Sequence, residues 1–211
     1  MKEIVIFGDS LTGGRYGVGY GRYLKHKAVM RGIDGQYMGE ILDRANRFCE
    51  THEDRIIVLE GGANDIVLGN CDKTVFCSWE QELSELSKMC FCLIVCTITP
   101  IGENPKSKFN QIRSAINDDI RLHAKSCGYK VADLAQNLEN MLSGTDLERS
   151  PLELMFEDRT RLESSDAEKE SLRISTSRGF NISTDGVHLN CKGAESVASV
   201  LDSSLRAVNQ R

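Results

Sequence analysis

Near the start of the chain, an apolar run at residues 4–7 leads through Gly8 and Asp9 to Ser10. In open parallel α/β sheets, reactive groups gather in the crevice beyond the carboxyl ends of the strands. Ser10 is therefore a candidate nucleophile. A serine hydroxyl becomes a useful nucleophile when a neighbouring base takes its proton, so the chain should also supply a base.

Two other segments carry groups that could complete such a site. Asp185 and His188 lie three residues apart, and in one helical turn that spacing would let the carboxylate hold the imidazole ring. Asn64 comes shortly after a second apolar run, residues 55–59, so its amide should emerge at the same sheet edge as Ser10. A nucleophile, a base, an orienting acid and an oxyanion donor are all predicted.

Taken together, these segments resemble the SGNH hydrolases, the GDSL family of esterases and lipases. Each motif is weak alone, but they follow the family's order and span nearly the whole chain. The matching segments are Gly8-Asp9-Ser10-Leu11, Gly32-Ile33-Asp34-Gly35-Gln36, Gly62-Ala63-Asn64-Asp65 and Asp185-Gly186-Val187-His188-Leu189-Asn190. The simpler interpretations are a turn at Ser10, a helix cap at Asn64 and a surface histidine at 188.

The resemblance implies a role for each matching residue. Ser10 would attack a carbonyl carbon, and His188 would take its proton and return it to the leaving alcohol. Asp185 would hold the imidazole tautomer and stabilise the imidazolium. The backbone amides of Ser10 and Gly35 and the Asn64 side chain would bind the oxyanion, with Gly32 as the rival to Gly35. No metal or organic cofactor is implied.

The expected activity is that of a serine esterase on a small or short-acyl carboxylic ester, with a carbohydrate O-acetyl group as one candidate. Similar proteins include lysophospholipases and acyl-thioesterases, and an acyltransferase could use the same triad. A non-catalytic binding module that retains the fold is an alternative of another class. A flavodoxin-like nucleotide binder is disfavoured, because the chain has neither a G-x-G-x-x-G segment nor a P-loop.

Composition narrows the partners. The 211-residue chain has a formal net charge of −5, whereas a nucleic-acid binder is expected to carry an excess of basic residues. No apolar run approaches the roughly 18 residues of a membrane span, and the start of the chain does not resemble a signal peptide. We expect one domain over residues 1–211, a cytoplasmic location and a small-molecule ester as the partner, with the oligomeric state left open.

Strand-like and helix-like segments alternate along the chain, which predicts a three-layer αβα sandwich around a five-stranded parallel sheet. This flavodoxin-like arrangement is also the fold that the resemblance to SGNH hydrolases implies. The predicted strands are residues 3–7, 28–32, 55–60, 91–98 and 129–133. The predicted helices are residues 38–51, 78–88, 107–127, 134–142 and 192–207.

Three features outside these motifs have two interpretations each. Tyr16 and Tyr20, in a glycine-rich segment after Ser10, are candidate substrate contacts or parts of a mobile rim. Residues 143–183 are either a surface helix with loops or a lid that lays Leu152, Leu154, Met155 and Phe156 over the site. The cysteines at 90, 92 and 96 lie in an apolar run, where we expect buried side chains and no metal site.

Overall fold

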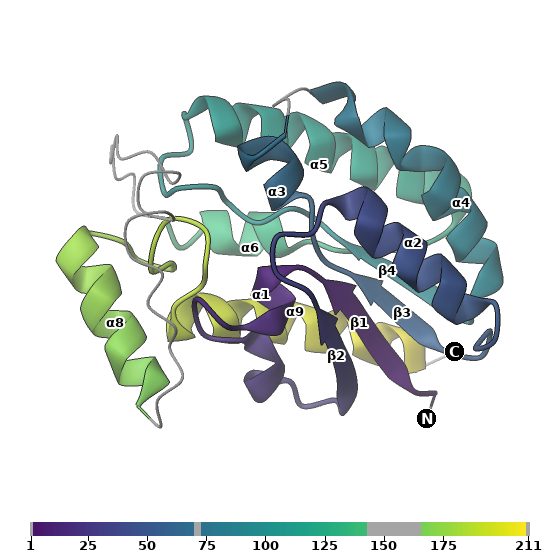
Figure 1. Cartoon of the computed structure of the whole chain (residues 1–211), viewed down its shortest axis with the longest axis horizontal. Coiled ribbons are helices and arrows are strands. Elements are labelled where there is room, and N and C mark those ends of the chain that lie inside the picture. Colours follow the sequence, from purple (N-terminus) through teal and green to yellow (C-terminus); the bar gives the residue numbers. More distant parts are fainter. Residues whose placement is uncertain (1, 70–72, 143–165, 210–211) are drawn as a thin grey trace.

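A parallel five-stranded sheet, in the order β2-β1-β3-β4-β5, forms the centre of the molecule (Figure 1). The computed structural model describes residues 2–69, 73–142 and 166–209. The strands are β1 (Ile4–Gly8), β2 (Ala28–Gly32), β3 (Ile56–Leu59), β4 (Cys92–Cys96) and β5 (Lys130–Ala132). All five strands of the predicted sheet are confirmed, each with ends within two residues of those expected.

Helices cover both faces of this sheet. The α-helices are α1 (Ser10–Gly13), α2 (Met38–Cys49), α3 (Ala63–Val67), α4 (Glu80–Met89), α5 (Lys108–Cys127), α6 (Leu134–Glu139), α8 (Ala167–Arg178) and α9 (Cys191–Asn209). The described residues also include the short 3-10 helices η1 (Tyr20–Tyr23) and η2 (Lys73–Ser78). The predicted αβα sandwich is therefore confirmed.

Strand residues alternate between two apolar clusters, because successive side chains of a strand point to opposite faces. Val5 and Phe7 of β1 pack in one cluster with apolar residues of α2, α4 and α5. Ile4 and Ile6 pack in the other with residues of α6 and α9. Burial on both faces explains why the central strands are continuous apolar runs.

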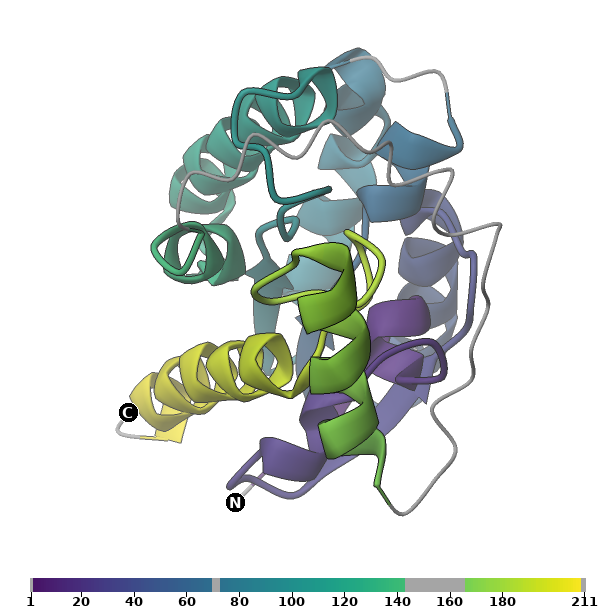
Figure 2. The ribbon, with the colours of Figure 1, turned by 90° about the vertical axis from the view of Figure 1, so that its left-hand side faces the viewer.

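Among the described α-helices, three were not specifically predicted. Helices α1 and α3 are too short to show a helical repeat of apolar residues. Helix α8 falls within the segment 143–183, and it lies against α9 at the end of the molecule that Figure 2 brings to the front. Residues 143–165, with the four apolar residues of the candidate lid, lie outside the described residues.

The strand order reverses at β1, which has β2 on one side and β3 on the other. Such a switch point opens a crevice at the carboxyl ends of the strands. Helices α1 and α3 begin there, at the ends of β1 and β3 (Figure 1).

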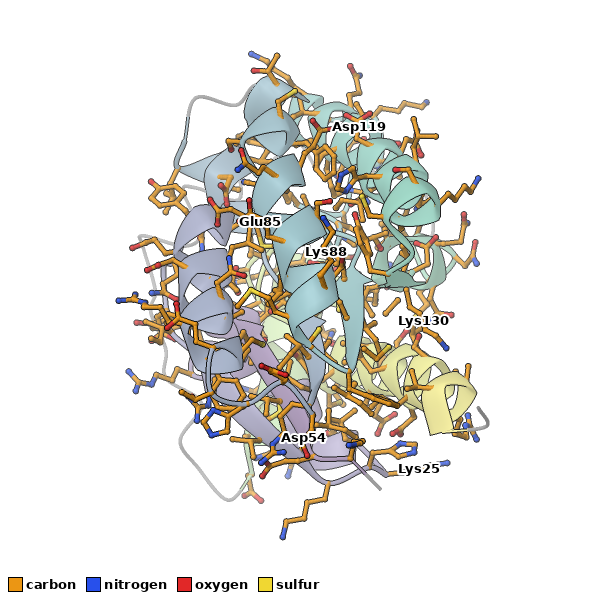
Figure 3. The ribbon with its side chains drawn as sticks, turned by 90° about the vertical axis from the view of Figure 1, so that its right-hand side faces the viewer. Lys25, Asp54, Glu85, Lys88, Asp119 and Lys130 are labelled. Carbon is orange, nitrogen blue, oxygen red and sulfur yellow. The ribbon has the colours of Figure 1, made fainter. Side chains whose placement is uncertain are left out.

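The opposite end of the molecule carries charged side chains near the amino ends of the strands, among them Lys25, Asp54 and Lys130 (Figure 3). Among the described residues, no helix has the length and apolar character needed to cross a membrane.

Candidate active site

Ser10 occupies the first position of α1, at the carboxyl end of β1. Asp9 caps this helix, because its Oδ1 accepts a hydrogen bond of 2.9 Å from the Leu11 N–H. The cap fixes the turn from strand to helix. The backbone N–H of Ser10 belongs to the first turn, where amides lack acceptors within the helix and are available to a ligand.

His188 reaches Ser10 from a loop near the other end of the chain. Its Nε2 lies 2.9 Å from Ser10 Oγ, and its Nδ1 lies 2.6 Å from Asp185 Oδ2. The conditional expectation of a helical turn here was wrong: the segment is a loop closed by an antiparallel bridge between Ser183 and Leu189. Asp185 meets the ring because its Oδ1 also accepts the His188 backbone N–H, at 2.7 Å.

This geometry defines the proton positions on the imidazole. The Asp185 carboxylate accepts the Nδ1 proton, which leaves the Nε2 lone pair facing the Ser10 hydroxyl. Burial alone would lower the pKa of His188, but the Asp185 charge and hydrogen bond outweigh burial and raise it above 6.5. Burial opposes ionisation of Asp185, yet His188 and two backbone amides hold the Asp185 pKa below its ordinary value.

Asn64, in the first turn of α3, points its amide toward the same crevice from the adjacent strand. Its Nδ2 donates to the Gln36 carbonyl at 2.9 Å and to Asp9 Oδ2 at a longer 3.3 Å. Both contacts orient the amide. The longer bond is the weaker of the two, so its proton is the one that an oxyanion could share or take over.

The structure separates the roles of the two glycines that compete for the oxyanion site. A Cβ on Gly32 would lie 2.2 Å from the Gly13 nitrogen, so Gly32 is needed for close packing of β2 against α1. Gly35 lies in the open loop after β2 with a φ of +77°, and a Cβ there would meet no atom within 4 Å. A glycine is favoured at position 35 because of this backbone conformation, which sets the direction of the neighbouring peptide groups.

Asp9 was not singled out from the sequence, although an acidic residue directly before a helix start is a recognisable capping signal. Burial raises the Asp9 pKa from 3.8 to about 6, and the Leu11 amide and His188 offset part of this shift. Asp9 contacts both helix α1, which begins with Ser10, and the Asn64 amide. It therefore links the two halves of the site.

Tyr20 does not lie where a substrate contact requires it. Its side chain is completely buried at the start of η1, and its hydroxyl lies 2.6 Å from Thr12 Oγ1. Thr12 in turn donates to Glu60 Oε2 at 2.7 Å. Burial raises the pKa of Glu60 well above its usual range, helped by the Asp9 charge, although the hydrogen bonds with Thr12 offset part of this shift. Tyr20 is therefore part of the core beneath α1.

Tyr16 lies beside the imidazole. The two ring centroids are 5.2 Å apart and tilted by 55°, and the tyrosine is only half-buried. This geometry leaves part of the Tyr16 side chain open to solvent next to the His188 ring.

The expectation that Cys90, Cys92 and Cys96 are buried holds fully for Cys96 alone among these three. Cys96 is buried in the core, and Cys90 and Cys92 are half-buried. Within residues 2–69, 73–142 and 166–209, no group of three histidine, cysteine or acidic side chains is arranged to hold a metal ion.

Comparison with known proteins gives the family. The model of the GDSL-like lipase/acylhydrolase family matches residues 4–201. The chain belongs to this family. Membership identifies the protein as an ester hydrolase. Among curated proteins, none matches the chain by sequence.

Solved structures show the same fold at low sequence identity. A lipolytic G-D-S-L family protein from Veillonella parvula is 20% identical with a TM-score of 0.69, and the match covers 98% of this chain and 99% of that one. The acetyl xylan esterase AlAXEase is 18% identical with a TM-score of 0.65, covering 96% and 99%. Axe2, an acetylxylan esterase from Geobacillus stearothermophilus, is 16% identical with a TM-score of 0.62, covering 98% and 94%.

Proposed function

We propose that this GDSL hydrolase is a serine esterase that cleaves small or short-acyl carboxylic esters through Ser10, His188 and Asp185. The observation that carries the proposal is the continuous chain of contacts from Ser10 Oγ through the imidazole to the Asp185 carboxylate, with distances of 2.9 and 2.6 Å. Nucleophile and base lie within hydrogen-bond reach, and a third group orients the base.

In the first half of the reaction, Ser10 Oγ attacks the carbonyl carbon of the ester while His188 Nε2 takes its proton. Asp185 stabilises the imidazolium that forms. The oxyanion is bound by the Ser10 backbone N–H, the Gly35 backbone N–H and the Asn64 amide. Collapse of the tetrahedral intermediate breaks the bond to the alcohol, which leaves with the proton from His188 and leaves an acyl group on Ser10.

Water completes the cycle by the same route. His188 removes a proton from a water molecule as its oxygen attacks the acyl-enzyme, and the second tetrahedral intermediate releases the carboxylic acid. His188 returns the proton to Ser10 Oγ. The half-exposed Tyr16 would contact the substrate beside the imidazole.

A small acyl group, such as an O-acetyl group on a carbohydrate, is the preferred substrate class. The two acetylxylan esterases with this fold support that choice. The test is a series of p-nitrophenyl esters from acetate to decanoate, followed by acetylated sugars. We expect kcat/KM to be highest for acetate or butyrate. A maximum at decanoate would favour the lysophospholipase or thioesterase alternative, and no hydrolysis of any ester would contradict the proposed function.

A further inference from the structure

A buried carboxylate outside the proposed triad holds the segment that leads into the Asp185–His188 loop. Glu103 follows β4, and only 1% of its surface is exposed. Its Oε2 accepts the Asn181 N–H at 2.7 Å. Its Oε1 accepts the Ile182 N–H at 2.8 Å, the Ser183 N–H at 3.0 Å and the Ser183 hydroxyl at 2.9 Å. A carboxylate buried this deeply is stable only when hydrogen bonds replace its hydration, and at least four do so here.

The connection continues from Glu103 to both sides of Asp185. The Ser183 hydroxyl, which donates to Glu103, also accepts the Gly186 N–H at 3.2 Å. The residue before Glu103 contributes as well, since the Gly102 N–H donates to the Gly186 carbonyl at 2.6 Å. The residues that flank Asp185 are thus tied to the loop that carries Glu103.

That loop is itself anchored to helix α5. Asn110 is buried, and its Oδ1 accepts the Ile101 N–H at 3.0 Å, while its Nδ2 donates to the carbonyls of Ile101 and Asn104, each at 2.8 Å. Arg113, one turn further along α5, donates to Asn110 Oδ1 at 2.8 Å. The backbone on both sides of Glu103 is therefore held by a regular element.

From these contacts we infer that Glu103 is a positioning residue, which fixes residues 181–183 so that Asp185 holds His188 at Ser10. The inference rests on the proposed function. The reason for such a device is that residues 184–188 form neither helix nor strand, so their position depends on contacts from outside the segment. Misplacement of a catalytic group by about 1 Å can slow a reaction on the order of 100-fold.

Glu103→Gln is the direct test. Glutamine has nearly the same size, but its NH₂ group would face N–H and O–H groups whose hydrogen bonds the carboxylate now accepts. We expect the rate of Ser10 labelling by a fluorophosphonate to fall roughly 10- to 100-fold. We also expect kcat for p-nitrophenyl acetate to fall with little change in KM. The downfield proton NMR resonance of the His188 Nδ1–H, bonded to Asp185, should shift or broaden.

Asp202→Asn is the matched control. Asp202 is also a buried carboxylate, which accepts two backbone amides and the His26 ring, but it holds the segment before β2 at the far end of the molecule, where Figure 3 shows Lys25. This variant should lose thermal stability and keep the wild-type labelling rate. If Glu103→Gln does not fold, Ser183→Ala removes one of the four bonds and should slow labelling roughly 2- to 10-fold.

The outcomes separate this inference from the proposed function. The positioning role would be overturned by a folded Glu103→Gln variant that keeps the wild-type labelling rate, kcat and NMR resonance. That result would leave the proposed triad intact. If wild-type Ser10 is not labelled at all, the proposed function fails. The His188 resonance then still decides whether Glu103 positions the loop, because it does not depend on reactivity.

Discussion

At the scale of single residues, the site depends on a balance between burial and charge. His188 and Asp185 are both buried, which would by itself disfavour their charged forms. The opposite charge of the partner, together with their hydrogen bond of 2.6 Å, reverses that preference for both groups, raising the His188 pKa and lowering the Asp185 pKa. The pair is thus arranged to stabilise an imidazolium beside Ser10.

The pH dependence of activity should report this balance. The neutral imidazole is the proposed base, so kcat/KM should rise with pH through one ionisation with a midpoint above 6.5, the ordinary pKa of histidine. In Asp185→Asn the charge is lost while burial remains, so the midpoint should move down. Turnover should also fall by about 10⁴-fold, because the amide favours the wrong tautomer. The pH–rate profiles of both proteins on one soluble ester measure both effects. An Asp185→Asn midpoint equal to that of wild type would count against a His188 Nδ1 proton held by the Asp185 carboxylate.

Asn64 offers a second test at this scale. Removal of its amide in Asn64→Ala should lower kcat by about 10²- to 10³-fold with little change in KM, because the amide would bind the oxyanion more strongly than the ground-state carbonyl. Steady-state kinetics on p-nitrophenyl acetate measure both constants. An increase confined to KM would instead make Asn64 an ordinary binding residue.

At the scale of elements, α3 serves two purposes. Its Asn64 faces the crevice, while Asp65 Oδ2 accepts the N–H of Met38, the first residue of α2, at 2.9 Å. An acidic side chain at a helix N-terminus also complements the helix dipole. The loop after β2 is therefore tied to α3 by Asp65 at its end and by Asn64 through the Gln36 carbonyl.

The burial of Asp65 should affect how the free energy of unfolding depends on pH. Burial raises its pKa from 3.8 to about 6, although the Met38 amide offsets part of the shift. A carboxyl group whose pKa is raised on folding stabilises the protein below its unfolded pKa and loses that contribution as the pH rises through its folded pKa. Asp65→Asn removes this pH dependence. The free energy of unfolding of Asp65→Asn, minus that of wild type, should therefore increase by up to about 3 kcal/mol as the pH rises from 4 to 7, because folding shifts the Asp65 pKa from 3.8 to about 6.

Urea denaturation at several pH values measures this difference. Glu60, whose pKa is also raised by burial, should contribute equally to wild type and variant and cancel in the difference. Loss of the Asp65 charge also removes a smaller contribution that raises the Asp9 pKa, which acts in the same direction. Parallel curves for the two proteins across this range would show that Asp65 does not titrate as the structure implies.

The elements that the sequence predicted well are those whose apolar pattern is set by burial. Helix 107–127 was predicted within one residue, because its buried positions recur along its length. Strand 28–32 was also predicted with the bounds it has, although this edge strand is only partly buried. Helices α1 and α3 are shorter than one repeat. Glu103 could not be found from sequence, because most of its partners are backbone amides, which have no residue signature.

At the scale of the whole molecule, the parallel sheet brings together groups that are far apart along the chain. Ser10 and His188 are separated by 178 residues and meet because β1 ends at the switch point and the 183–189 loop precedes α9, which packs under the same sheet. The order of motifs predicted this meeting through the family resemblance. The loop that brings His188 there is a tertiary feature, held by contacts from residues 102 and 103, and local spacing does not predict it.

The most direct test of the triad is the site of covalent labelling. Ser10 is proposed as the nucleophile, so the folded protein treated with a fluorophosphonate should gain the mass of one phosphonyl group, and peptide mapping should place it on Ser10. Ser10→Ala, with a circular dichroism spectrum like that of wild type, should gain no mass and hydrolyse no ester. Labelling of the alanine variant at another serine together with retained turnover would contradict the assignment of Ser10, His188 and Asp185.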